Sequence, residues 1–449
     1  MSRTALKRAV ALAGLALIAS LVLSQPAPPT LPEGMDLGKP LTLADCVRIA
    51  LAVNPDLFVA ENGVRQAAAA VTQTRSAQLP SLAFEGSAGA TRRRGAANSG
   101  GGGSPSANPS TTSWGTDLVL TQTLYQSGLS EGIRSAKASA QASRLGVDDA
   151  RRTVILTVAQ SYYTALAARA LVDVAGRTLQ NSAQHVEAAT ARITAGTAAR
   201  SDLYPFEVEM AQARLAAIIA ENQAQTSLTS LKEAIGLPAE TSLQLADELG
   251  RPPLTETLPD LLRTAYQERP DVRRQLALIE AVRLTSRVAE IERGAVLDVS
   301  GNATYGTGSG ATGTAAQIQA GVTFPLFDGG FTKARAESAR AALDSSRQAL
   351  QQLQIAVGAE VESSYLNAAE ASNRIDAAET ALRAAQVSLD AAEGRYGAEV
   401  GIGTVIEVTD AQVKLRQAEV DRVQAYYDYN TALAALRAAI GQPAVPGIE

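Results

Sequence analysis

Four segments of the chain alternate apolar residues with small or polar residues at every second position. They cover about residues 81–91 and 114–125 in the first half of the chain, and 296–306 and 316–327 in the second half. A period of two is typical of β-strands with one apolar and one polar face. About ten residues is also the length of a bilayer-crossing strand. A half-buried sheet of a soluble protein would show the same alternation, so the pattern alone leaves both interpretations open.

A helical period follows each pair of alternating segments. Residues 128–194 and 330–396 are rich in Ala, Gln, Arg, Glu and Leu and contain no proline. A helix of that length would extend for about 100 Å, so it must pack against other helices for most of its length. Apolar residues recur there at steps of three and four, at Ile155, Val158, Tyr162 and Leu166 and again at Leu350, Leu353, Val357, Val361 and Tyr365. Shorter helices to pack beside them are expected near residues 56–78, 201–235, 271–293 and 405–440.

The chain carries an internal duplication. Thr42-Leu43-Ala44-Asp45 returns as Thr257-Leu258-Pro259-Asp260, and a Pro-Asp pair follows each run at the same distance. Each half also ends in an Ile-Gly pair. We therefore predict two repeats, at 41–236 and 257–441. The remaining segments are an N-terminal linker at 25–40, a linker or equatorial segment at 237–256, a C-terminal tail at 442–449 and a Gly-rich loop at 95–113.

The first residues have the features of an export signal. Arg3, Lys7 and Arg8 precede an uncharged stretch over residues 9–23. That stretch is shorter than the roughly 20 residues of a spanning helix, so a signal peptide over residues 1–24 is favoured over a membrane anchor. No cysteine follows it closely. The mature chain is therefore expected to be exported and not lipidated.

Composition argues against several functions. Aromatic residues make up only 4 % of the chain, and there is one histidine, His185, and one cysteine, Cys46. An intrachain disulfide framework and a Cys/His zinc cluster are therefore excluded, and no catalytic or cofactor-binding constellation is evident. The net charge of −5 is not that of a nucleic-acid binder. We expect no enzyme activity, no cofactor, no metal and no nucleic acid, with His185 facing solvent and Cys46 in a core.

A four-stranded amphipathic sheet has two open edges, and lipid offers no partners for their backbone groups. Other copies of the chain would have to close the sheet into a ring. The predicted fold is an α+β membrane protein in which duplicated helix-strand-strand-helix units form a β-barrel that continues into a long α-helical barrel. The number of copies does not follow from the sequence.

The chain resembles the TolC-family outer-membrane efflux proteins, or outer membrane factors, over essentially its whole mature length. Four features carry the resemblance. A Thr-Leu-x-Asp motif begins each repeat, and residues 79–82 lead into the first strand. Leu326-Phe327-Asp328-Gly329-Gly330 lies at the end of the last strand, and two helix-tip turns complete the set. It implies a homotrimer with a twelve-stranded barrel in outer-membrane lipid and a twelve-helix periplasmic tunnel. It also implies docking to an inner-membrane RND or ABC pump through a periplasmic adaptor (membrane fusion) protein.

The same resemblance assigns roles to the helix tips. The adaptor-contact tips would be Ala195, Gly196 and Thr197 in the first turn and Val400, Gly401 and Ile402 in the second. The periplasmic gate would be formed by Asp202, Tyr396, Glu407 and Asp410. Glu407 and Asp410 lie one helical turn apart and face the same side, so around a ring they would form carboxylate constrictions that favour cations. A helix-capping role is the alternative for Ser201 and Asp202. Gly403 stands where a prototypical member has an arginine, so a closing ion pair is either missing or moved to Arg200.

The function predicted in this way is a passive trimeric channel that carries drugs or other small molecules in a tripartite efflux system. One alternative is a type I protein secretion exit duct of the same fold. A periplasmic coiled-coil adaptor or scaffold protein is the alternative from another class, because it shares the export signal and the long helices.

Overall fold

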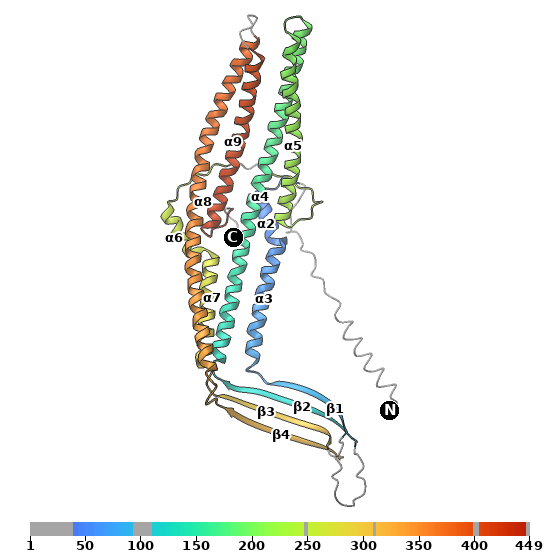
Figure 1. The fold of residues 1–449 in the computed structure, drawn as a ribbon, viewed down its shortest axis with the longest axis vertical. Helices are drawn as coiled ribbons and strands as arrows, with labels where there is room; N and C mark the ends of the chain where they lie inside the picture. Colours follow the sequence, from blue (N-terminus) through green and yellow to red (C-terminus); the bar gives the residue numbers. More distant parts are fainter. Residues whose placement is uncertain (1–38, 93–109, 247–249, 309–310, 398–403, 446–449) are drawn as a thin grey trace, which may run out of the picture.

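The computed structural model describes residues 39–92, 110–246, 250–308, 311–397 and 404–445. The predicted signal peptide, most of the linker at 25–40 and the tip residues Val400, Gly401 and Ile402 lie outside the described residues, as does most of the loop at 95–113. Figure 1 shows an elongated molecule with a sheet at one end and two helical hairpins reaching the other end.

The sheet contains one hairpin from each repeat. β1 (Ser81–Arg92), β2 (Ser110–Gln126), β3 (Val296–Gly308) and β4 (Ala311–Thr323) are antiparallel in the order β1-β2-β3-β4. The register places one apolar face and one polar face on the sheet, as the alternation predicts. Phe84, Leu118 and Ala303 are neighbours in one row, and Glu85, Asp117 and Thr304 are neighbours in the next row on the opposite face.

Two strand boundaries differ from the expected ranges. β2 begins at Ser110, several residues earlier than expected. β4 spans Ala311–Thr323 and not 316–327, because Pro325 follows it and has no N–H to donate to a ladder. A bulge between Thr123 and Tyr125 shifts the register near the end of β2, so that Tyr125 and not Leu124 is paired with Leu297 of β3. The ring of Trp114 packs edge-on against that of Tyr305 with their centroids 5.4 Å apart.

Two very long helices connect the sheet to the far end of the molecule (Figure 1). α4 (Leu129–Thr194) has 66 residues and α8 (Phe331–Gly397) has 67. Their expected apolar stripes face the interior: Val158, Tyr162, Val357 and Val361 are fully buried. None of the helices in the described ranges combines the length and the apolarity that a bilayer-crossing helix needs.

Shorter helices pack beside each long one. α3 (Pro55–Ser76) and α7 (Pro270–Ile291) lie along the sheet-side half of the long helices, and α5 (Leu203–Ile235) and α9 (Val405–Ala439) lie along the tip-side half. α2 (Leu43–Val53) and α6 (Leu258–Glu268) are short helices at mid-length. Cys46 on α2 is completely buried, as expected. Burial raises the pKa of its thiol to about 12.

The duplication is visible at two equivalent contacts, which we call joints. At each joint, the residue between two consecutive helices (α2 and α3, or α6 and α7) meets the C-terminal end of α5 or α9. In the first repeat the Asn54 amide donates to the Ala234 carbonyl at 2.8 Å, and in the second the Arg269 guanidinium donates to the Ala439 carbonyl at 2.8 Å. Gly236 follows the first contact with φ 91° and Gly441 follows the second with φ 83°. Both repeats therefore use a left-handed glycine to bring two backbones together.

Replacing Gly236 by alanine is expected to destabilise the protein. The added Cβ would lie 3.0 Å from the Asn54 Cα and 3.3 Å from the Val53 carbonyl oxygen, and φ is positive. Left-handed backbone alone costs about 1–2 kcal/mol for a residue with a Cβ. The matched control is Gly63→Ala on α3, which has open space around the Cβ and gains up to about 1 kcal/mol of helix propensity. The midpoint temperature of thermal unfolding, followed by circular dichroism, should fall for Gly236→Ala and rise for Gly63→Ala.

Candidate functional site at the helix tips

The first tip is a tight turn between α4 and α5. Ala195, Gly196 and Thr197 are all exposed there, and Gly196 adopts φ 74° with open space where a Cβ would stand. The backbone N–H and the hydroxyl of Thr197 both donate to the Arg192 carbonyl, at 3.0 and 3.1 Å. Glycine is thus required for the backbone angle, and the three expected tip residues are presented to solvent.

Asp202 lies at the end of a 3-10 turn, Arg200–Asp202, that precedes α5. Its carboxylate accepts a hydrogen bond from the Ser201 hydroxyl at 3.2 Å. The N-cap position of α5 has no side-chain hydrogen bond, so the capping alternative for Ser201 and Asp202 is wrong. The half-buried Asp202 carboxylate therefore makes no capping hydrogen bond to the backbone of α5.

Tyr396 lies in the last turn of the long helix α8 and contacts the other hairpin. The Arg192 guanidinium carbon lies 4.4 Å from the centre of the Tyr396 ring, and Arg192 Nη1 donates to the Tyr396 carbonyl at 3.1 Å. The ring also meets Phe206 edge-on, with their centroids 6.2 Å apart. The Tyr396 hydroxyl is buried and has no hydrogen-bond partner within the described part of the chain, so no bond joins it to Asp202 in one subunit. Arg192 was not anticipated from the sequence.

The second tip places two carboxylates on the first turns of α9. Thr404 caps the helix, because its hydroxyl accepts from the Glu407 N–H at 3.3 Å. The Glu407 carboxylate lies 3.5 Å from Arg395 Nε at the end of α8. Asp410 is exposed one turn further along the helix. Among the described residues Arg200 makes no ion pair, so Arg395 and not Arg200 balances the charge at this tip.

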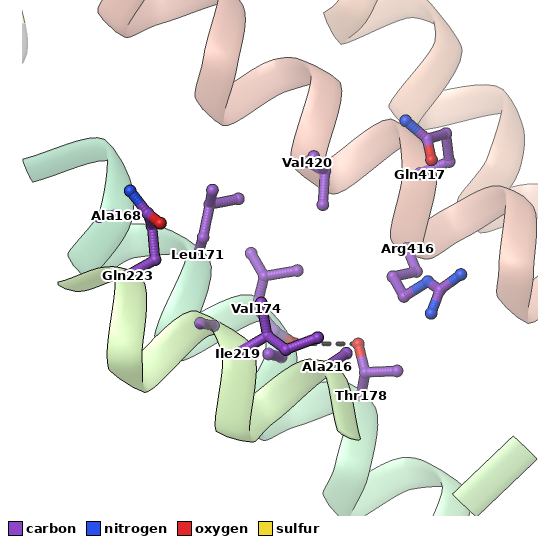
Figure 2. A pocket seen from close by; sticks show the side chains of 12 residues that line it. Ala168, Leu171, Val174, Thr178, Ala216, Ile219, Gln223, Arg416, Gln417 and Val420 are labelled. Carbon is purple, nitrogen blue, oxygen red and sulfur yellow. Dashed lines mark hydrogen bonds between the residues drawn. The ribbon is translucent and has the colours of Figure 1, made fainter. Parts of the chain in front are cut away.

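Behind the tips, the α4/α5 hairpin meets α9 along a line that we call the seam. A cavity of about 360 Å³ opens on this seam (Figure 2). Its walls are apolar side chains of all three helices, among them Leu171, Val174, Ile219 and Val420, and Arg416 stands on the α9 side. The Thr178 hydroxyl in the same wall donates to the Val174 carbonyl at 2.9 Å.

One turn of α9 closer to the tip, the seam becomes polar. His185 is not solvent-facing as expected: its side chain is only 20 % exposed and its ring stacks on Phe206, with 5.6 Å between centroids. The imidazole contacts Gln412 of α9 and lies 3.7 Å from the Glu393 carboxylate of α8. Burial lowers the pKa of His185 and raises the pKa of nearby Glu209 to about 7. The expectation failed because polar neighbours in the sequence gave no sign of the helices that cover this position.

The chain contains two copies of a helix-strand-strand-helix unit. It has an amphipathic sheet at one end and helix turns bearing carboxylates at the other. This arrangement defines the class of outer-membrane channels with a helical extension, and comparisons with known proteins agree. The sequence profile described as "Outer membrane efflux protein" matches residues 46–237 and again 261–442. The chain therefore belongs to the outer membrane efflux protein family, and the two matched segments correspond to the duplication seen in the sequence.

Relatives and solved structures are similar over most of the chain. "Protein CyaE" of Bordetella pertussis is 27 % identical over 94 % of this chain and 88 % of its own length. "Pyoverdine export outer membrane protein OpmQ" of Pseudomonas putida is 27 % identical over 89 % of this chain and 85 % of its own. The crystal structure of the Campylobacter jejuni CmeC outer membrane channel matches with a TM-score of 0.74 at 19 % identity, over 89 % of this chain and 85 % of that one.

These findings confirm the TolC-type fold and the resemblance drawn from the sequence. The protein is an outer-membrane efflux channel of the TolC type, and the alternative of a periplasmic adaptor or scaffold is wrong. Members of the family are trimeric channels of the bacterial outer membrane that work with adaptors and inner-membrane pumps.

Proposed function

We propose that three copies of this chain form a passive conduit that carries small molecules across the periplasm and the outer membrane. The observation that carries the proposal is the sheet, which is apolar on one face, polar on the other and open along β1 and β4. Such a sheet becomes stable in lipid once other copies close it into a barrel. Three copies would contribute twelve strands and a tunnel of paired long helices. Residues 1–24 would direct export, without lipidation of the mature chain.

The two helix tips would serve as the contact with a periplasmic adaptor that links the channel to an inner-membrane RND or ABC pump. Ala195, Gly196 and Thr197 support this proposal because they are exposed at the end of the first hairpin. Val400, Gly401 and Ile402 are proposed for the same role from the sequence resemblance alone.

Asp202, Tyr396, Glu407 and Asp410 would form the periplasmic gate. Glu407 and Asp410 are exposed on one side of α9, and a ring of copies would gather their carboxylates around the entrance. Tyr396 would hold the end of α8 against α4 through Arg192.

Replacing Glu407 and Asp410 together by alanine is expected to weaken block of the channel by divalent cations about tenfold or more, because clustered carboxylates attract such ions. The measurement is single-channel current in a planar bilayer with increasing divalent cation on the periplasmic side. Asp421→Ala is the control, since Asp421 is an exposed acid farther up the same helix. Equal block in the parent and in the double variant would remove both residues from the gate.

Efflux itself is tested by deleting the gene and measuring susceptibility to antibiotics and detergents. A small-molecule efflux channel predicts increased susceptibility, restored by the parent gene. Unchanged susceptibility together with the loss of a secreted protein from the medium would instead identify a type I secretion duct.

A further inference from the structure

A buried amide joins three helices on the seam. Gln412 of α9 is only 9 % exposed and lies between His185 of α4 and Glu209 of α5. In the amide orientation that satisfies both neighbours, its oxygen accepts from His185 Nε2–H and its NH₂ group donates to the Glu209 carboxylate, at 2.8 Å from Oε2. A single side chain thus connects the α8/α9 hairpin to both helices of the other hairpin.

Two charged side chains and one aromatic ring lie next to this contact. Glu393 of α8 lies 3.7 Å from His185 Nε2, and Arg416 of α9 exerts an attractive charge on Glu209. The other face of the imidazole is covered by Phe206 of α5. Phe206 in turn contacts the Tyr396 ring, so a chain of direct contacts joins the seam to the end of α8.

We propose that Gln412, His185 and Glu209 form a latch, a set of positioning residues that holds the α4/α5 hairpin against α9 and so keeps the periplasmic gate closed. The proposal rests on the gate described under the proposed function. It adds residues behind the tips to that gate. It also assigns to Glu209 and His185 opposite effects on how the stability of the closed state depends on pH.

The opposed responses follow from the pKa directions. Burial, against the attraction of Arg416, raises the pKa of Glu209 from 4.5 to about 7, so the closed seam favours the protonated acid and tightens as the pH falls through 7 towards 4.5. Burial, against the attraction of Glu393, lowers the pKa of His185 below 6.5, so the closed seam favours neutral imidazole and loosens as the pH falls below 6.5. In the parent protein the two effects therefore act in opposite directions over the acidic range.

Single substitutions should therefore reveal pH responses of opposite sign. In His185→Gln, Glu209 is the latch residue that still titrates, and the open probability of single channels should fall between pH 7.5 and 5. In Glu209→Gln only His185 titrates, and the open probability should rise over the same range. Each change can reach tenfold per pH unit, the limit for one fully coupled proton. Loss of packing alone would raise the open probability of both variants in parallel, and parallel profiles would overturn the proposal.

The latch can also be observed without any channel recording. His185 is the sole histidine in the sequence, so ¹⁵N-histidine labelling of the full chain in lipid nanodiscs, purified without a histidine tag, yields a single imidazole for magic-angle-spinning NMR. The parent should show the neutral Nε2–H tautomer at pH 7.5 and a titration midpoint below 6.5. Gln412→Leu should shift the Nε2 signal by several ppm, because the hydrogen-bond acceptor is removed. An unchanged Nε2 signal with an ordinary midpoint would overturn the latch.

The two measurements separate the possible failures. A parent protein that does not conduct would contradict the channel proposal, while the NMR titration would still decide whether the three side chains are bonded. A conducting parent whose His185→Gln and Glu209→Gln profiles both match its own would contradict the latch alone.

Discussion

Replacing Leu118 by arginine is expected to abolish assembly of the protein in the outer membrane. Leu118 lies on the apolar face of β2, paired with Phe84 of β1 and Ala303 of β3. Arginine facing lipid costs about 2–4 kcal/mol near the bilayer midplane, and a ring of copies incurs that cost once per subunit. The measurement is the amount of heat-resistant oligomer in outer-membrane fractions, which should fall by more than tenfold.

The matched control is Val119→Arg, one residue further along the same strand. Val119 points to the opposite face, in register with Asn302 of β3, so an arginine there would meet water inside the barrel. This variant should assemble normally and shift the single-channel ion preference towards anions. If both arginine variants assemble equally well, the apolar face of the sheet does not contact lipid.

Replacing Arg269 by methionine should destabilise the second repeat by about 3–5 kcal/mol, the usual cost of breaking a buried ion pair from one side. The Arg269 side chain is 4 % exposed and forms two bonds with Asp271, at 2.7 and 3.0 Å, as well as one with Glu360 at 2.7 Å. Methionine fills similar space but leaves the buried Asp271 carboxylate without its cation. Denaturant unfolding of the detergent-solubilised protein measures the loss.

Arg263→Met is the control, because Arg263 and its partner Asp260 are both exposed and such pairs contribute about 1 kcal/mol or less. A pH series adds a second criterion. Burial alone would raise the pKa of Asp271, but its bonds with Arg269 outweigh burial and lower it below 3.8. The pair therefore stabilises the fold above that pH and loses its effect as the pH falls below it. Equal losses in the two variants at neutral pH would show that the buried pair is dispensable.

Periodic features were predictable from the sequence because each follows from local geometry. The stripe from Ile155 to Leu166 and the alternation in β3 determine which side of an element is apolar, whatever packs against it. The duplication then fixed the order of the elements. Strand ends were less predictable, since the end of β4 depends on Pro325 and not on the alternation itself.

Contacts between distant segments could not be read in the same way. His185 looked exposed because its sequence neighbours are polar, and only the meeting of α4, α5, α8 and α9 encloses it. Arg192 and Arg395 carry no motif that distinguishes them from other helix arginines, yet they hold Tyr396 and Glu407. The proposed gate residues were named from the family resemblance, and contacts between them in a ring depend on further copies of the chain, which the sequence of one chain does not position.

The two equivalent joints of the repeats are built from chemically different groups, an uncharged amide at Asn54 and a charged guanidinium at Arg269. Strong acid protonates the carboxylates of Asp271 and Glu360 that bind Arg269 at the second joint, and it leaves the neutral amide joint nearly untouched. In strong acid, every subunit would therefore lose stability at the Arg269 joint and keep it at the Asn54 joint. In a ring of such subunits, less stable and more stable joints would then alternate around the wall.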